Sequence, residues 1–558
     1  MDLAIIRKYA LENAVKHDGK CVPGAIIGKL INEDNSIKNK LKEINPDLMK
    51  IIKEVNKLSL EKQTSELQKL APELLEKKPV EERKLKDLPD VKGKVVMRFA
   101  PFPSGPLHIG NSRTAILNDE YAKKYKGKLL LVIDDTIGSE EKQIEPDAYK
   151  LIPEGLAWLG IKFSETFYKS QRLEIYYKYA DELIKKEKAY VCSCSSENIH
   201  KHRELQKACN CRSQTIKENL EKWNLMFDKK TKEGAYTLRI KTSMQDPNPA
   251  FRDRVIFRIS ERKHPLVKNK YKVWPLLDFS WAIDDYLLGI THIIRGKELM
   301  IETEMESYIW NIFNWPHSVT LYNGLFQIEG IKLSKSKSAK EVKSGEYIGW
   351  DDPRTWSIQS LKRRGFKPEA IRNFILSLGM NPTEIVVPVE NLYSENRKLI
   401  EKEANRYFFI EKPVKIKLKK VPNMKYAEAP LHPDYPKKGN RKLKLDVKNS
   451  ELELFISSTD KLEKNKNYRF MHLFNFKNNE FLSKDFDPKL NTKQIHWLPI
   501  KDIINVEIMM DNGETIKGIA EADIQKVKVN DILQFERNFF ARLDKKEKNK
   551  LVFWYTHK

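Results

Sequence analysis

The pattern of apolar and polar positions over residues 95–135 predicts a βαβ unit. Residues 95–99 form a short apolar run that is typical of a buried parallel strand. Prolines and a glycine between 101 and 106 exclude regular structure, and apolar residues at helical spacing follow from about His108. A second buried strand is expected over residues 129–133. Because a crossover within one sheet is right-handed, the two strands are expected to be parallel.

The start of this helix is a candidate phosphate site. Ligands bind beyond the carboxyl ends of parallel strands, where helix N-termini present free N–H groups to anions. Gly110 would let a ligand approach the backbone, and His108 and Asn111 can donate to phosphate oxygens. At the other end, Gly127 is expected to cap the helix. The alternative is that His108 only caps the helix start and that Gly110 only relieves crowding.

A second stretch, residues 330–338, is a run of lysines among small hydroxylated residues. Lysine is a compact point charge that suits a triphosphate, so Lys332 and Lys335 are candidate ligands for one. Taken alone, this stretch is better explained as a solvated basic loop.

Together the two stretches resemble the HIGH and KMSKS motifs of class I aminoacyl-tRNA synthetases. They read His-Ile-Gly-Asn at 108–111 and Lys-Leu-Ser-Lys-Ser at 332–336. The wider context, from Arg98 to Gly110, looks like the archaeal type of glutamyl-tRNA synthetase. This resemblance runs from about Leu11 to the C-terminus. Asn111 stands where the motif's name has histidine, and either side chain can donate a hydrogen bond.

The resemblance implies a glutamate–tRNA ligase. ATP and L-glutamate would give glutamyl-adenylate and pyrophosphate, and the glutamyl group would pass to the 3′-terminal ribose of tRNA(Glu), with tRNA(Gln) left open as a second acceptor. Attack on the α-phosphate needs positioning and charge neutralisation, here with Mg²⁺ on the triphosphate. The implied catalytic residues are His108, Asn111 and Lys335. The implied ATP-binding residues are His108, Gly110, Asn111, Lys332, Ser334 and Lys335.

The resemblance assigns the amino acid substrate to Arg98, Ala100, Asp134 and Arg295. Arg98 and Arg295 stand where the family holds the side-chain carboxylate, and a guanidinium suits that group. Asp134 stands where the family grips the α-amino group. Its neighbour Asp135 is expected to point the other way and brace a loop, because successive strand residues alternate. A structural ion pair is the alternative for Arg98.

Two positions depart from the family's pattern. Leu277 stands where many relatives carry tyrosine, which puts a tyrosine hydroxyl contact to the amino acid in doubt. Trp281 stands where relatives often have a smaller side chain, so the edge of the pocket is left open.

Four of the five cysteines occur as two close pairs, which in a cytosolic protein indicate a metal site rather than disulfides. Four thiolates suit a closed, structural zinc site. The expected ligands are Cys192, Cys194, Cys209 and Cys211. His200 or His202 could replace one thiol, and unliganded thiols remain the alternative because the C-x-C spacing is tight.

Composition adds a polyanionic partner. The chain has 558 residues, 40% of them hydrophobic, and a net charge of +24. A protein this basic usually meets a polyanion, although a lysine-biased proteome would account for part of the excess. Without a run of about 18 apolar residues or a signal-peptide core, a cytoplasmic protein with no membrane contact is expected. A monomer is expected as well.

The expected fold is multidomain, with an α/β Rossmann-like catalytic core and a C-terminal β-barrel. The barrel follows from period-two alternation after Pro413, where basic and aromatic residues also mix as in RNA-binding surfaces. With the resemblance, the expected parts are an N-terminal helical extension and linker (1–90), the first half of the catalytic domain (91–187), an inserted acceptor-end-binding domain with the zinc site (188–270), the second half of the catalytic domain (271–330), the KMSKS loop and helical stem-contact domain (331–412) and the anticodon-binding barrel (413–558).

Two rival functions are carried forward. Glutaminyl-tRNA synthetase has the same architecture, and the loop Ala100–Gly105 favours the glutamyl branch over it. A non-enzymatic tRNA-binding protein on the same fold would need a ruined active site, and the intact motif residues argue against this.

Overall fold

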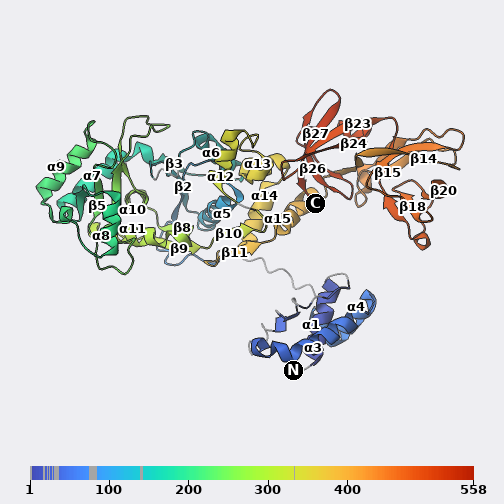
Figure 1. Cartoon of the computed structure of the whole chain (residues 1–558), viewed down its shortest axis with the longest axis horizontal. Coiled ribbons are helices and arrows are strands. Elements are labelled where there is room, and N and C mark those ends of the chain that lie inside the picture. Colours follow the sequence, from blue (N-terminus) through green and yellow to red (C-terminus); the bar gives the residue numbers. More distant parts are fainter. Residues whose placement is uncertain are drawn as a thin grey trace. The chain divides into compact units, whose positions relative to one another are not determined.

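Figure 1 shows a computed structural model of the chain. The structure describes residues 3–16, 19–21, 23, 26–27, 29–30, 37–74, 85–138, 143–331 and 333–558. The chain divides into two compact units, Met1–Lys84 and Leu85–Lys558, which are described separately. Within the described part of the chain, every helix is too short or too polar to cross a bilayer.

The first unit is helical, with α1 (Leu3–Lys16), α3 (Ile37–Val55) and α4 (Leu60–Leu70). Leu11 of α1 and Leu48 of α3 are among the residues of its apolar core. Helices were expected here, and α3 and α4 are separate helices because Ser59 caps α4 by accepting from the N–H of Lys62. Residues 76–84 of the expected linker lie outside the described residues.

The second unit begins with a five-stranded parallel sheet in the order β3-β2-β1-β8-β9. Its strands are β1 (Val96–Phe99), β2 (Lys128–Ile133), β3 (Glu165–Tyr168), β8 (His292–Gly296) and β9 (Val319–Asn323). The predicted βαβ unit is confirmed: α5 (Ile109–Lys124) joins β1 to the parallel β2. Leu129 and Leu131 of β2 pack on one side of the sheet and Leu130 and Val132 on the other, which is why the strand is apolar throughout.

The left-handed cap residue after α5 lies one residue before Gly127, the position where it was expected. The left-handed position is taken by Lys126, with φ of 49°. Gly127 donates its N–H to the carbonyl of Ala122 at 2.8 Å. Its lack of a side chain serves packing, because a Cβ there would lie 2.3 Å from the carbonyl oxygen of Val95.

Helices surround the sheet, and an insertion interrupts them. The helices are α6 (Ala148–Trp158), α7 (Leu173–Lys185), α10 (Leu277–Leu287) and α11 (Met300–Phe313). The insertion is an antiparallel sheet with two helices, composed of β4 (Ala189–Cys192), α8 (Ser196–Glu204), α9 (Ile216–Phe227), β5 (Thr237–Ile240), β6 (Val255–Ile259) and β7 (Val273–Pro275). Because β7 pairs with β6, this sheet continues past residue 270, where the insertion was expected to end.

A helical region connects the core to the C-terminal part (Figure 1). It contains β10 (Phe326–Ile328), α12 (Lys335–Ser344), α13 (Ile358–Arg364), α14 (Pro368–Leu378), β11 (Ile385–Val387) and α15 (Val389–Ile400). β10 and β11 pair in parallel and tie the two ends of this region together. Ser357 caps α13 by accepting from the N–H of Ser360.

The C-terminal part is all strand apart from short 3₁₀ turns, as the period-two pattern predicts. A seven-stranded sheet in the order β12-β25-β26-β27-β23-β24-β13 surrounds one apolar core. Its strands are β12 (Asn405–Tyr407), β13 (Phe409–Glu411), β23 (Ile503–Met509), β24 (Thr515–Glu521), β25 (Ile532–Phe535), β26 (Phe539–Lys546) and β27 (Lys550–His557). Since β12 and β13 precede Pro413, the strands begin slightly earlier than expected.

In the same C-terminal part, smaller sheets enclose a second apolar core, separate from that of the seven-stranded sheet. They contain β14 (Pro413–Leu418), β15 (Tyr426–Pro430), β16 (Asn440–Lys444), β17 (Leu452–Ser457), β18 (Asn467–Phe470), β19 (Asn475–Lys477), β20 (Glu480–Ser483), β21 (Lys493–Ile495) and β22 (Leu498–Pro499). The aromatics Phe470, Phe474 and Trp497 are buried in this core, so these three side chains serve packing rather than an RNA-facing surface.

Candidate active site

A cavity of about 990 Å³ lies at the carboxyl ends of β1, β2 and β8. Its lining includes the predicted site residues Arg98, Ala100, His108, Gly110, Asn111, Asp134, Arg295 and Lys335. Two motif stretches more than 200 positions apart in the chain therefore share one cavity. Lys332, which was assigned to ATP, lies outside the described residues.

His108 is the N-cap of α5 and forms a reciprocal pair with Asn111. Its ring Nδ1 accepts the backbone N–H of Asn111 at 3.3 Å, and the amide oxygen of Asn111 accepts the backbone N–H of His108 at 3.4 Å. A neutral ring that accepts at Nδ1 carries its proton on Nε2. The capping role therefore leaves two donors for a ligand, the Nε2–H of His108 and the side-chain amide of Asn111.

Gly110 is where the two motif stretches come into contact. A Cβ at this position would lie 2.7 Å from Cε1 of His108 and 3.3 Å from Cδ1 of Leu333. The glycine is thus needed so that the imidazole can fold over the helix start and the second motif can approach it.

The second motif begins a helix. Ser334 is the N-cap of α12, and its hydroxyl accepts the N–H of Lys337 at 3.3 Å. Ser334 is not among the cavity-lining residues, whereas Leu333 and Lys335 are. Burial and the charge of Lys335 lower the pKa of His108 to about 3, so the imidazole is neutral at physiological pH.

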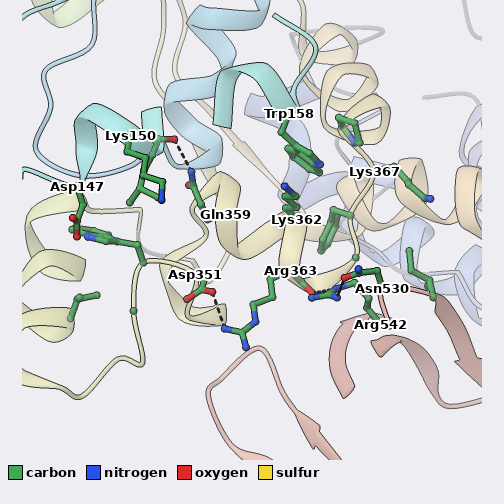
Figure 2. A pocket seen from close by; sticks show the side chains of 18 residues that line it. Asp147, Lys150, Trp158, Asp351, Gln359, Lys362, Arg363, Lys367, Asn530 and Arg542 are labelled. Atoms are coloured by element: carbon green, nitrogen blue, oxygen red, sulfur yellow. Dashed lines mark hydrogen bonds and ion pairs between the residues drawn. The ribbon is translucent and has the colours of Figure 1, made fainter. Parts of the chain in front are cut away.

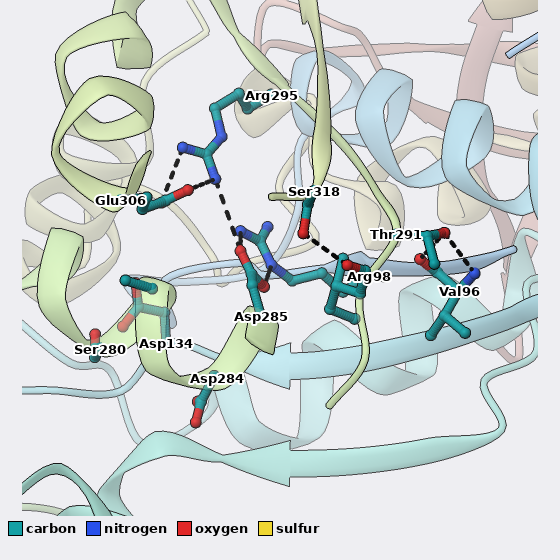
Figure 3. Close-up of polar contacts among 12 residues, drawn as sticks. Val96, Arg98, Asp134, Ser280, Asp284, Asp285, Thr291, Arg295, Glu306 and Ser318 are labelled. Carbon is teal, nitrogen blue, oxygen red and sulfur yellow. Dashed lines mark hydrogen bonds and ion pairs between the residues drawn. The ribbon is translucent and has the colours of Figure 1, made fainter. Parts of the chain in front are cut away.

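The two arginines assigned to the side chain of the substrate are already paired with carboxylates (Figure 3). Arg98 donates through Nε and Nη2 to both oxygens of Asp285, at 2.5 and 2.7 Å. Arg295 donates to both oxygens of Glu306 at 2.9 and 3.0 Å, and its Nη2 lies 3.9 Å from Asp285. The ion-pair alternative for Arg98 is therefore present in the structure, although both arginines still line the cavity.

Asp134 and Asp135 diverge as the alternation of a strand requires. Asp134 lines the cavity and lies 3.3 Å from Nζ of the fully buried Lys169. Asp135 turns away and accepts from the backbone N–H and the hydroxyl of Ser170 and from the hydroxyl of Tyr149. Asp135 thus braces the loop before α7, as predicted.

Sequence reasoning missed Lys169, Asp285 and Glu306. Asp285 lies in α10, and no spacing rule connects it to Arg98. Glu306 lies in a helix with ordinary periodicity and is fully buried. No local pattern marks either contact, because the partners are brought together by the tertiary fold.

The four paired cysteines gather in the insertion. Their sulfur atoms all lie within 4.8 Å of one another, and Sγ of Cys192 lies 3.8 Å from Sγ of Cys209. Zinc at about 2.3 Å from each sulfur would require separations of about 3.8 Å, so the donor set fits this ion. The cluster contains neither His200 nor His202. Arg239 places Nη1 at 3.8 and 3.7 Å from two of the sulfurs, where it would support thiolates.

A basic groove of about 860 Å³ lies between α6, α13 and the C-terminal barrel (Figure 2). Its cationic lining residues are Lys150, Lys362, Arg363, Lys367 and Arg542, against the acidic Asp147 and Asp351. Arg363 and Arg542 pair closely with Asp544, whereas Lys150 and Lys367 each lie 3.9 Å from a glutamate, so the lysines are held less tightly than the arginines. The half-buried Trp158 adds flat apolar surface. This combination of charge and aromatic faces suits a nucleic acid backbone.

Two family descriptions match the chain. Residues 94–402 match the family model for the catalytic domain of tRNA synthetases class I (E and Q). Residues 404–495 match the family model for the anti-codon binding domain of tRNA synthetases class I (E and Q).

The chain is similar over its full length to curated proteins named glutamate–tRNA ligase. It is 41% identical to those of Methanococcus maripaludis and Methanocaldococcus jannaschii and 42% identical to that of Pyrococcus abyssi, covering 99% of both chains in each case. A solved glutamate tRNA ligase from Elizabethkingia meningosepticum, in complex with its amino acid, is 20% identical with a TM-score of 0.41, over 56% of this chain and 71% of that one.

Proposed function

We infer the activity of this chain from one premise, that it belongs to the class I tRNA synthetases of the E and Q type. It is a glutamate–tRNA ligase, as its full-length relatives are named. The observation that supports this activity most directly is the single cavity that holds a helix start, Lys335 and the arginine pair. The glutaminyl alternative is not favoured by these relatives.

For the first step we propose that ATP binds at the start of α5. The Nε2–H of His108, the amide of Asn111 and the ammonium of Lys335 would stabilise the charge that grows on the α-phosphate as the carboxylate of glutamate attacks it. Gly110, Ser334 and Lys332 complete the proposed ATP-binding set. Mg²⁺ would be held mainly by the triphosphate oxygens, where it supplies charge neutralisation.

For the amino acid we propose three contacts. Asp134 would accept the α-ammonium group, and Arg98 and Arg295 would face the side-chain carboxylate from the cavity wall. Ala100, on the wall beside Arg98, leaves room for the substrate. The side chain at 277 is leucine, so no hydroxyl is offered at that position.

We further propose that tRNA is held along three regions. The insertion, braced by zinc on Cys192, Cys194, Cys209 and Cys211, would support the acceptor end. The basic groove beside α13 would follow the backbone of the stem, and the C-terminal barrels would hold the anticodon. Cytoplasmic location and a monomeric state complete the proposal.

The test is to charge purified tRNA transcripts with each labelled amino acid. We expect glutamate to be attached to tRNA(Glu) with ATP consumption and AMP release, and glutamine not to be attached. Charging with glutamine but not glutamate would overturn the assignment. Including a tRNA(Gln) transcript in the same experiment decides whether this tRNA is a second acceptor.

A further inference from the structure

The charges behind the site proposed for the side-chain carboxylate of glutamate are already balanced before a substrate arrives. Arg98 pairs with Asp285 and Arg295 pairs with Glu306, and each of the four side chains is at most 4% exposed. Only the two arginines reach the cavity, since the two carboxylates are not among its lining residues. Nearby, Asp134 and Lys169 form a further opposed pair. A substrate carboxylate at Arg98 and Arg295 would therefore meet two guanidiniums that are each already paired with a carboxylate.

The surroundings make that excess charge costly. The ring of Trp281 lies under both guanidiniums, with centroid distances of 4.9 and 4.8 Å to Arg98 and Arg295. Trp281 is 6% exposed and lines the cavity, so it keeps water from the ion pairs. An uncompensated charge in such a place is expensive, and buried groups commonly change protonation instead.

Of the two carboxylates behind the site, Glu306 is the one that can be neutralised more easily. Asp285 on α10 is placed between two guanidiniums, whereas Glu306 on α11 has only that of Arg295. The charged groups that face Glu306 are Arg295 from β8, Asp285 from α10 and, farther away, Arg98 from β1. On its own helix, Glu302 turns to Arg254 instead. Burial raises the pKa of Glu306 to about 7 against the lowering effect of Arg295, and Asp285 adds to the rise.

We propose that Glu306 takes up one proton when the side-chain carboxylate of glutamate binds at Arg98 and Arg295. The proton comes from solvent, converts the Glu306 carboxylate into a carboxylic acid, and returns to solvent when the ligand leaves. No other bond changes. Arg295 then carries an uncompensated positive charge that the substrate neutralises. The inference rests on the proposed function, since it assumes that glutamate occupies this cavity.

Glutamine provides the contrast. Its side chain is neutral, so its binding would leave the four charges balanced and would require no proton. Selection of glutamate over glutamine is therefore expected to weaken as the pH rises above that at which Glu306 loses its proton. Glu306 thus acts as a specificity-determining residue that does not itself touch the substrate.

The first test is the KM for glutamate in ATP–pyrophosphate exchange with tRNA(Glu) present, between pH 6 and 8.5. We expect KM to be constant below about pH 6.5 and to rise by up to tenfold per pH unit above about pH 7, the slope for one linked proton. In Glu306→Gln, the neutral amide replaces the acid, and KM should stay flat across the range. Glu304→Gln, at an exposed position of the same helix, should keep the wild-type slope. An equal slope in wild type and Glu306→Gln would overturn the proposal.

A second test needs only the wild-type protein, in case Glu306→Gln fails to fold. Glutamate binding to the enzyme–tRNA complex is measured by calorimetry at pH 7.5 in phosphate and in Tris, which differ in ionisation enthalpy. The proposal is supported if the two binding heats differ by the difference in buffer ionisation enthalpy for most of one proton taken up. Identical heats refute it. Absence of exchange with glutamate at every pH would contradict the proposed function itself. Exchange with a KM that does not vary with pH would contradict only this inference.

Discussion

At the residue scale, His108 shows that a side chain can cap a helix and still present a ring N–H to a cavity. Its Nδ1 caps α5 through the N–H of Asn111, which directs the ring proton to Nε2. Its neutral state follows from burial beside Lys335, so the ring is available as a donor without carrying charge. A bare His-x-Gly pattern could not distinguish these uses.

Lys335→Ala should slow adenylate formation about 10²–10³-fold, the usual loss for one transition-state donor. The measurement is the rate of ATP–pyrophosphate exchange with tRNA present. Lys337→Ala is the matched control, because Lys337 is exposed on the same helix and pairs with Glu341. A near-wild-type rate for Lys335→Ala would contradict the assigned role.

At the scale of single elements, Gly127 controls how closely β1 and the start of β2 approach. Gly127→Ala would place a Cβ 2.3 Å from the backbone oxygen of Val95, and backbone cannot yield as a side-chain end can. We expect a loss of about 1–3 kcal/mol, typical of overpacking. Thermal unfolding should show a lower midpoint. Gly93→Ala is the control, since a Cβ there meets nothing within 4 Å, and an equal midpoint for both variants would contradict the account.

The cysteine cluster can be tested separately, through its metal content. Purified protein should contain one zinc per chain by elemental analysis, and Cys209→Ser should reduce this content well below one because the tetrahedral set is broken. Cys21→Ser, in the separate N-terminal unit, should leave the content unchanged. Zinc-free protein from zinc-supplemented cells would favour unliganded thiols.

At the scale of the whole second unit, α13 links the first motif to the C-terminal barrel. At its start, the N–H of Ile358 donates to the carbonyl of Leu107, and the N–H of Ile109 donates to the carbonyl of Trp356. At its end, Arg364 donates to the carbonyls of Tyr555 and Thr556 in β27. Seven residues of helix therefore join the substrate cavity to the last strand of the chain.

His557 makes this junction sensitive to acid. It is fully buried, lies 3.0 Å from the amide of Asn396 and packs on Tyr393, and burial lowers its pKa to about 4. The unfolded chain, with a pKa near 6.5, binds a proton first as the pH falls. The neutral ring therefore stabilises the fold above about pH 6.5, and up to about 3 kcal/mol is lost between pH 6.5 and 4.

His557→Gln should accordingly reduce the fall in the thermal midpoint between pH 7 and 5. His317→Gln, at an exposed histidine, should leave that fall unchanged. If His557→Gln kept the full acid sensitivity of the wild type, the junction would not be its source.

What the sequence alone determined is local. Apolar runs, prolines and helical spacing specified the βαβ unit, because they act over a few neighbouring residues. The paired cysteines indicated their cluster for the same reason, since a metal site leaves its ligand types visible in the chain. The two motif stretches identified the family, because their resemblance to known motifs can be recognised without any spatial information.

Only the tertiary structure decided which charges meet. Arg98 and Asp285 are 187 positions apart, and Lys169 and Asp134 come from different elements. Glu306 has no sequence signal, yet it lies behind the site because α11 packs against β8 and α10 there. Electrostatic balance depends on distance in space and on burial, and neither quantity can be read from the order of residues along the chain.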